Sequence, residues 1–353
     1  MSELMTAFVD LPDVLAPFVA GNRSRATGAG LDPHEYGRVT EPLGSLHDWP
    51  EAFAAAGREH RAAGERAAAL GRAVSAGEAY RLAARWFHFA TLLPHPDRAG
   101  AARAAADADE AMDRALALLD PTAVRIEGTG FVGRLRRPAG VERPPVVLVV
   151  PGLDSGKEEF HGVTQALLRR GVAAFTLDGP GQGVLAATSG PEPDYHRVVG
   201  RVIDALEPRG EVDGGRIAVI GLSLGGYYAA VSAAHEPRIR ATATVSGPDR
   251  LDWEALPPFV TDTLTQRCAG PGAAREFAGR VDLAAVAPLI AGPLRVVDGG
   301  LDVIPGAVNG EPLARRAAQG EYLLVPHGDH LLGNAVRDWL PGTADWLVER
   351  LGG

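Results

Sequence analysis

Short, continuous apolar runs separated by helical stretches recur through the last two-thirds of this chain. The runs cover residues 146–150, 172–177, 217–220, 241–245, 294–297 and 322–325. Strands that are buried on both faces have this pattern. Stretches with helical character, such as 158–170, 195–206 and 224–235, separate most of them. Such strand–helix alternation predicts an α/β fold, with a mainly parallel sheet and helices on both faces. Two shorter segments, 124–126 and 131–135, are predicted to pair as antiparallel strands ahead of it.

The pattern changes near Pro121. Before it the chain is rich in Ala, Arg and Glu, and apolar residues recur at helical spacing, as in Leu82, Trp86, Phe89 and Leu93. We therefore expect residues 1–120 to form an N-terminal helical domain and residues 121–353 an α/β domain. Residues 249–293 are longer than one crossover needs, so a helical insertion over the sheet edge is expected there.

One motif points directly to chemistry. Gly221-Leu-Ser-Leu-Gly225 follows the apolar run 217–220 and precedes a helical stretch. This strand–turn–helix context is what a nucleophile elbow requires, because the sharp turn lifts the serine hydroxyl above the sheet. The motif predicts Ser223 as a nucleophile, and the alternative is a purely structural turn.

A serine nucleophile needs a base, and the base needs an orienting carboxylate. In this arrangement the chain order is serine, acid, histidine. Asp302 lies in the loop after the expected 294–297 strand and is the predicted acid, with Asp298 at the strand end as the alternative. His330 follows the last expected strand and is the predicted base in preference to His327.

Two backbone N–H groups are expected to stabilise the oxyanion that develops during the reaction. One belongs to Leu224, directly after the nucleophile. The other belongs to Leu153, in the loop after the 146–150 strand, where Gly152 permits close backbone approach. The alternative for this loop is a plain strand-to-helix turn.

Composition excludes several other classes of function. The net charge is −9, with 46% apolar and 22% charged residues, which is typical of a soluble globular protein and not of one that binds nucleic acid. No run of about 18 apolar residues and no basic leader occur, so neither a transmembrane helix nor a signal peptide is expected. Cys268 is the only cysteine and is interpreted as an ordinary thiol, which fits a cytoplasmic location. The spacing of His327 and His330 lacks a third ligand, so no metal and no cofactor is expected.

Four motifs together resemble one branch of the α/β-hydrolase superfamily. They are Pro-Gly-Leu-Asp-Ser-Gly-Lys-Glu-Glu (151–159), Asp-Gly-Pro-Gly-Gln-Gly (178–183), Gly-Leu-Ser-Leu-Gly-Gly-Tyr-Tyr (221–228) and Gly-Asp-His (328–330). The chain is similar in these motifs to the group that contains 2,6-dihydroxypseudooxynicotine hydrolase and the hydrolases that shorten polyketide chains in fungal pigment pathways. FrsA-like esterases are more distant.

This resemblance implies an α/β-hydrolase fold whose N-terminal helical domain caps the site, and a homodimer. It also implies cleavage of a carbon–carbon bond next to a ketone in a small molecule, with Glu254 as the residue corresponding to a substrate-contacting glutamate. The expected function is a serine hydrolase acting on a C–C or ester bond of an aromatic or polyketide-like compound. The alternatives are a general carboxylesterase or thioesterase, and a non-catalytic binding protein on a hydrolase fold.

The helical half is expected to build the substrate pocket, because a nucleophile at the edge of a sheet needs a cover that excludes water. Tyr80 and His88 carry polar groups that burial would leave in need of a partner. We therefore expect one or both of them to face Ser223 across the domain interface.

Overall fold

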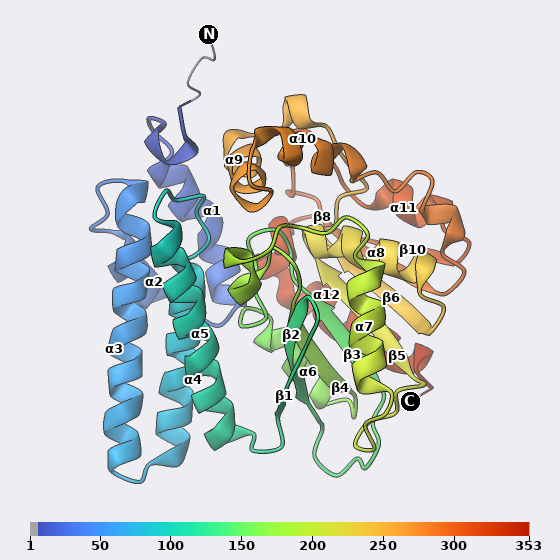
Figure 1. The fold of residues 1–353 in the computed structure, drawn as a ribbon, viewed down its shortest axis with the longest axis horizontal. Helices are drawn as coiled ribbons and strands as arrows, with labels where there is room; N and C mark the ends of the chain where they lie inside the picture. Colours follow the sequence, from blue (N-terminus) through green and yellow to red (C-terminus); the bar gives the residue numbers. More distant parts are fainter. Residues whose placement is uncertain (1–5, 353) are drawn as a thin grey trace.

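The computed structural model describes residues 6–352. Its N-terminal part is helical and lies along one side of a large twisted sheet (Figure 1). The α-helices of this part are α1 (Leu15–Gly28), α2 (Pro33–Thr40), α3 (Trp49–Ala69), α4 (Ala73–Phe89) and α5 (Arg98–Leu119). Short 3₁₀ turns, η1 (Phe8–Asp10) and η2 (Leu46–Asp48), precede α1 and α3.

Helices α3, α4 and α5 pack closely because glycines face large side chains. A Cβ on Gly57 would lie 2.7 Å from the ring of Phe87, and one on Gly64 would lie 2.8 Å from the ring of Tyr80. These two contacts join α3 to α4. The missing side chains thus admit aromatic rings between the helices, where close packing adds dispersion energy to apolar burial.

The central sheet has eight strands in the order β1-β2-β4-β3-β5-β6-β8-β10. The pairs β1–β2 and β2–β4 are antiparallel and the others are parallel. The mainly parallel sheet and the antiparallel β1–β2 pair are as the sequence predicts. The strands are β1 (Val124–Gly128), β2 (Phe131–Arg136), β3 (Val146–Val150), β4 (Ala173–Asp178), β5 (Ile217–Leu222), β6 (Ile239–Val245), β8 (Leu294–Gly299) and β10 (Gly320–Val325).

Helices cover both faces of this sheet, and the side chains of β3 show why its sequence is continuously apolar. Val147 and Val149 join the core under α6 (His161–Leu168) and α12 (Val336–Arg350). Leu148 points to the opposite face and packs in the core under α7 (His196–Leu206) and α8 (Leu224–His235). The short helix α11 (Glu311–Arg316) lies on the same side as α7 and α8. Both faces are therefore buried, which requires apolar residues at successive positions.

The predicted insertion is largely helical and arches over the carboxyl ends of the strands (Figure 1). It contains β7 (Arg250–Leu251), η4 (Trp253–Ala255), α9 (Pro258–Arg267), α10 (Pro271–Arg280) and η5 (Ala287–Leu289), and β7 pairs with β9 (Ala307–Val308). Two further 3₁₀ segments are η3 (Gly183–Ala187) and η6 (His330–Ala335). Phe18 of α1 packs against Phe259 of α9, with ring centroids 5.4 Å apart, so the first helix meets the insertion.

Candidate active site

Ser223 occupies a strained turn between β5 and α8. Its backbone has φ 56° and ψ −131°, a region that side-chain-bearing residues seldom adopt. Such strain is typical of functional positions that the surrounding structure holds in place. The flanking glycines are needed sterically: a Cβ on Gly221 would lie 1.9 Å from the carbonyl oxygen of Gly225, and one on Gly225 would lie 2.2 Å from that of Val150. The turn therefore has the geometry that the motif predicts.

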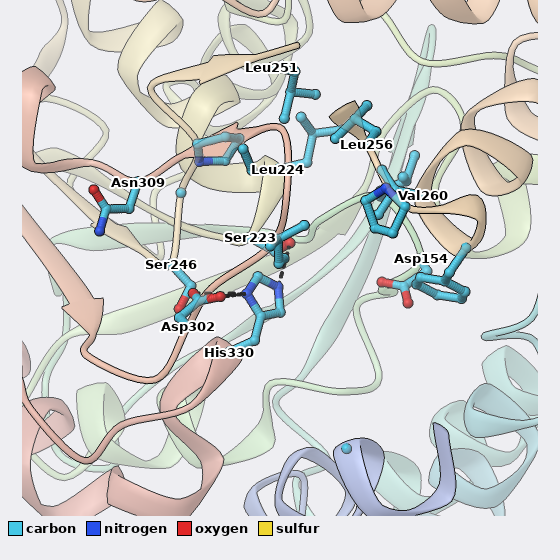
Figure 2. A pocket seen from close by; sticks show the side chains of 18 of the residues that line it. Asp154, Ser223, Leu224, Ser246, Leu251, Leu256, Val260, Asp302, Asn309 and His330 are labelled. Atoms are coloured by element: carbon cyan, nitrogen blue, oxygen red, sulfur yellow. Dashed lines mark hydrogen bonds and ion pairs between the residues drawn. The ribbon is translucent and has the colours of Figure 1, made fainter. Parts of the chain in front are cut away.

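The structure brings together the three residues predicted to form the triad (Figure 2). His330 Nε2 lies 3.0 Å from Ser223 Oγ, and His330 Nδ1 lies 2.9 Å from each carboxylate oxygen of Asp302. Burial alone would lower the pKa of His330, but the adjacent Asp302 carboxylate outweighs it and raises that pKa. The arrangement can accept a proton from the serine hydroxyl and stabilise the imidazolium that results.

Asp298 and His327, the alternative acid and the alternative base, do not contact Ser223. Asp298 is buried at the end of β8, accepts a hydrogen bond from the Gly310 N–H at 2.9 Å, and has its pKa raised by burial to about 7. His327 is exposed, and its Nε2 lies 3.2 Å from Asp338 Oδ2. His330 is thus the histidine whose ring bridges the serine and a carboxylate.

Leu153 and Leu224, the expected sources of oxyanion N–H groups, both line the cavity that contains Ser223. Gln182 donates from Nε2 to the carbonyl oxygens of Pro151 at 2.6 Å and Gly152 at 3.2 Å. In a planar trans peptide the C=O and N–H groups point in opposite directions. The hydrogen bond to the Gly152 carbonyl therefore directs the Leu153 N–H away from Gln182.

The cavity above Ser223 has a volume of about 360 Å³ and is lined mainly by apolar side chains. Its roof comes from α1 and the insertion, and its floor from the elbow and the loops after β3, β6 and β8. The apolar lining comprises Pro17, Phe18, Leu153, Leu224, Pro248, Leu251, Leu256, Pro257, Phe259, Val260, Leu264, Ile304, Ala307 and Val308. Asn22, Arg25, Asp154 and Asn309 add polar groups at its edges. A largely apolar enclosure with few polar groups is typical of a small-molecule site.

Comparison with known proteins adds an independent line of evidence. Residues 146–352 match the alpha/beta hydrolase family. The chain is also 32% identical, over 321 residues, to 2,6-dihydropseudooxynicotine hydrolase of Paenarthrobacter nicotinovorans, and the match covers 86% of this chain and 84% of that protein.

The chain belongs to the alpha/beta hydrolase family.

Further relatives of this hydrolase support the same assignment. A solved structure of 2,6-dihydroxy-pseudo-oxynicotine hydrolase superposes with a TM-score of 0.83 at 28% identity, covering 93% of this chain and 95% of that one. The 20-hydroxy-prefusarin hydrolase of Gibberella moniliformis is 34% identical over 231 residues, which are 60% of this chain and 54% of that protein. The family resemblance and the α/β-hydrolase fold predicted from the motifs are confirmed.

Three residues predicted to bind substrate in this hydrolase do not line the cavity. Tyr80 is buried between α3 and α5, against Gly64 and beneath the guanidinium of Arg114, 4.7 Å from the ring centroid. His88 is buried with its Nε2 2.9 Å from Glu159 Oε2. The expectation that one or both of them face Ser223 is therefore corrected: the His88 imidazole pairs with Glu159, and the Tyr80 ring packs against Gly64 and Arg114 away from the cavity.

Glu254, expected from the family resemblance to contact substrate, is also placed elsewhere. It lies in η4 with its side chain 70% exposed and paired with Arg275. It does not line the cavity. Leu251 and Leu256 on either side of it do line the cavity, but η4 turns the Glu254 carboxylate outward.

The contribution of α1 to the hydrolase cavity is the largest feature absent from the sequence predictions. Pro17, Phe18, Asn22 and Arg25 all reach the cavity from this helix. No local signal identifies them, because α1 lacks a clear apolar stripe and its partners lie more than a hundred residues away. The helical half does line the cavity as expected, but through its first helix and not through α4.

The described residues of this hydrolase also bear on membrane-spanning segments, metal sites and the single cysteine. Within residues 6–352, no helix is long and apolar enough to cross a membrane. Over the same residues, no cluster of His, Cys, Asp and Glu side chains has an arrangement that could hold a metal ion. Burial raises the pKa of Cys268 to about 11, so at neutral pH its sulfur remains a thiol and not a nucleophilic thiolate.

Proposed function

We propose that this protein is a serine hydrolase that cleaves a bond next to a carbonyl in an apolar small molecule, with Ser223, His330 and Asp302 as its catalytic triad. The observation that carries the proposal is the His330 ring, which bridges Ser223 Oγ and the Asp302 carboxylate on the floor of the cavity. The bond is a C–C bond beside a ketone or an ester bond, in an aromatic or polyketide-like compound.

The proposed reaction has two halves. His330 Nε2 takes the hydroxyl proton while Ser223 Oγ bonds to the substrate carbonyl carbon, and the oxyanion is stabilised by the N–H groups of Leu153 and Leu224. The bond to the leaving carbon or oxygen then breaks, and that atom takes the proton from His330. In the second half His330 activates a water, which attacks the acyl group and restores the serine.

The cavity supports an apolar substrate of modest size. A volume of about 360 Å³ is at the small end for ligand pockets, and its roof of Phe18, Phe259 and Leu264 offers apolar and aromatic contacts. Among the proteins that this chain resembles, one is named for 2,6-dihydropseudooxynicotine and another for 20-hydroxy-prefusarin. Neither name is that of a peptide, which favours a small organic substrate here.

The test uses a fluorophosphonate probe followed by a substrate panel. The probe is expected to label Ser223 covalently, and Ser223→Ala to abolish labelling. Ser232→Ala is the matched control, because Ser232 lies on α8 with its hydroxyl bonded to the Tyr228 carbonyl. Incubation with β-diketones, aryl esters and aryl thioesters, with products identified by mass spectrometry, then distinguishes C–C cleavage from general esterase or thioesterase activity. A wild-type protein that does not react with the probe would refute the serine mechanism.

The remaining expectations stay predictions. A homodimer is expected from the family resemblance, and light scattering at micromolar protein concentration tests it. A cytoplasmic location is consistent with the single cysteine, and fractionation of the cells that produce the protein tests it.

A further inference from the structure

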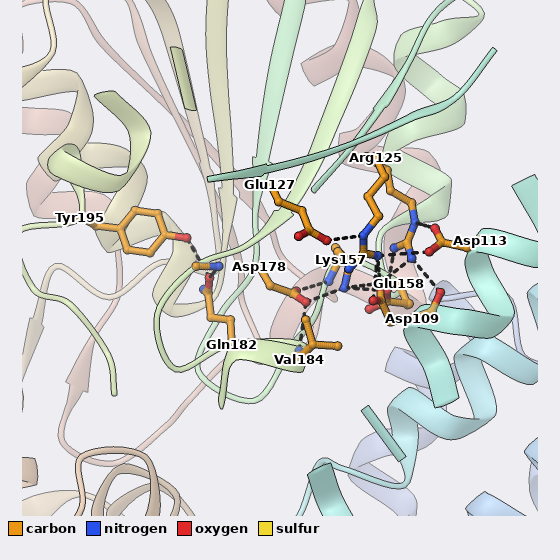
Figure 3. Close-up of polar contacts among 12 residues, drawn as sticks. Asp109, Asp113, Arg125, Glu127, Lys157, Glu158, Asp178, Gln182, Val184 and Tyr195 are labelled. Atoms are coloured by element: carbon orange, nitrogen blue, oxygen red, sulfur yellow. Dashed lines mark hydrogen bonds and ion pairs between the residues drawn. The ribbon is translucent and has the colours of Figure 1, made fainter. Parts of the chain in front are cut away.

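Residues 151–159, in the loop between β3 and α6, carry the proposed oxyanion donor Leu153 and are here called the oxyanion loop. It is held by ionic contacts from several directions. Lys157 and Glu158 contact a buried network that includes Asp109 of α5 (Figure 3). Asp154, Ser155 and Glu159 contact a different partner, Arg25 of α1. Helices of the N-terminal region thus hold both halves of the loop.

Arg25 binds three residues of this loop at once. Its Nε and Nη2 donate to the two Glu159 carboxylate oxygens at 2.6 and 2.9 Å. Its Nη1 donates to Asp154 at 2.8 Å, and Nη2 also donates to Ser155 Oγ at 3.1 Å. A planar guanidinium with donors in a fixed fork constrains the relative positions of its acceptors, which a point charge would not do.

These contacts lie where solvent does not weaken them. The side chain of Arg25 is 10% exposed and that of Glu159 is 2% exposed. Burial alone would raise the pKa of Glu159, but Arg25 and the neighbouring His88 reverse the effect and hold that pKa below its ordinary value. The charged Arg25–Glu159 pair is therefore present at neutral pH. His88 of α4 also contacts the Glu159 carboxylate.

Helix α1 also contacts the other side of the proposed site. The hydroxyl of Ser24 donates to the Asp329 carboxylate, directly before His330. A Cβ on Gly333 would lie 2.4 Å from the Ser24 carbonyl oxygen, so α1 and the η6 segment are in backbone contact. Two successive residues of α1 thus touch the loop of the proposed base and the oxyanion loop.

We propose that Arg25 is a positioning residue that holds the oxyanion loop in its active geometry, so that docking of α1 completes the site. The inference rests on the proposed serine mechanism. Leu153 and Asp154 are successive residues of the oxyanion loop, so loss of the Arg25–Asp154 contact removes a restraint on the segment that carries the Leu153 N–H. A displacement of about 1 Å in a catalytic group can cost about 100-fold in rate, and loss of one oxyanion donor costs about 100- to 1,000-fold in kcat.

The experiment compares Arg25→Ala and Arg25→Lys with Arg23→Ala. Arg23 lies on the same helix and is exposed, and its replacement by Ala removes the same charge. Arg25→Ala is expected to lower the second-order rate of fluorophosphonate labelling about 100-fold, and to weaken a trifluoromethyl ketone, which forms a tetrahedral adduct, by a similar factor. Arg25→Lys is expected to fall between Arg25→Ala and wild type, because an ammonium keeps the charge but not the fork. Arg23→Ala is expected to stay within about 2-fold of wild type.

Steady-state kinetics with an aryl ester separate positioning from loss of fold or pocket. The proposal requires kcat to fall while KM stays within about 3-fold, because a displaced oxyanion donor is lost in the transition state. Arg25 itself lines the cavity, so the same split is required of Glu159→Gln, whose side chain does not line it. If Arg25→Ala does not fold, Glu159→Gln serves as the second variant, because it replaces one of the two oxygens that accept from Arg25 with an amide NH₂, which cannot accept. Wild-type labelling combined with unchanged labelling of the Arg25 or Glu159 variants would refute this inference alone. Absence of wild-type labelling would instead refute the proposed function.

Discussion

The buried network below the oxyanion loop leads to a quantitative prediction about Lys157, the only lysine in the chain. Its Nζ is fully buried and lies 2.7 Å from Asp178, 2.9 Å from Asp109 and 3.0 Å from Glu158 (Figure 3). Burial alone would lower the pKa of Lys157, but these carboxylates outweigh it and raise that pKa. The perturbation is Lys157→Met, which keeps the length of the side chain and removes its charge.

The expected cost follows from what remains after the substitution. Arg134 still faces Glu158 and Asp109, but Asp178, which is 0% exposed, loses its only cationic partner among the described residues. Removing one member of a buried ion pair costs about 3–5 kcal/mol, because the other charge is left desolvated. With an unfolding entropy of about 2.1 cal/mol/K per residue over 353 residues, this corresponds to a decrease in Tm of about 4–7 °C.

Differential scanning calorimetry at several pH values measures the effect. An unpaired buried carboxylate has a folded-state pKa above its unfolded value, so the destabilisation is expected to be greatest at neutral pH and to shrink as the pH falls through the carboxyl range. Arg58→Met is the control, because the Arg58–Glu51 pair is exposed and worth at most about 1 kcal/mol. A Lys157→Met protein within about 1 kcal/mol of wild type at neutral pH would refute the reasoning.

Three further predictions concern the proposed site. His330→Ala is expected to lower kcat/KM by about four to six orders of magnitude, whereas His327→Ala changes it by less than about 3-fold, and the reverse result would assign the base to His327. Because Asp302 raises the pKa of His330, activity is expected to fall as the pH drops through a value above 6.5. Asp302→Asn removes that charge, so the acid limb of the residual kcat/KM profile should move to lower pH. A move of this limb to higher pH would contradict the assignment. Tyr80→Phe and Glu254→Gln are expected to leave KM within about 2-fold of the wild-type value for every substrate in the panel, because neither side chain lines the cavity. A change in KM for one substrate alone would indicate that the substituted residue contacts that substrate.

Much of the catalytic half could be predicted because its signals are local. A strand buried on both faces needs consecutive apolar residues, so runs such as 146–150 identify β3 without knowledge of its neighbours. The elbow needs glycines beside Ser223 because backbone atoms lie within about 2 Å of where their Cβ atoms would be. Chain order then limited the acid and the base to a few candidates, and the structure brings Asp302 and His330 to the serine.

The single lysine of the oxyanion loop is a sequence signal for the buried charge network, beyond the family motif that contains it. A chain with 35 basic residues uses lysine once. At that position the Nζ is enclosed by Asp109, Glu158 and Asp178, where a compact ammonium fits several carboxylates at once.

Tertiary structure alone decided which part of the helical region covers the site. Helical periodicity shows that one face of a helix is buried, but it does not show what lies against that face. The sequence predicts that the polar groups of Tyr80 and His88 need partners when buried, but it does not predict that Glu159 pairs with His88 or that Arg114 lies over the Tyr80 ring, both away from the cavity. Arg25 contacts the oxyanion loop at Asp154, 129 residues further along the chain, and at Glu159, 134 residues further along. Contacts of that kind depend on how the helices dock against the sheet, and local sequence patterns do not specify that docking.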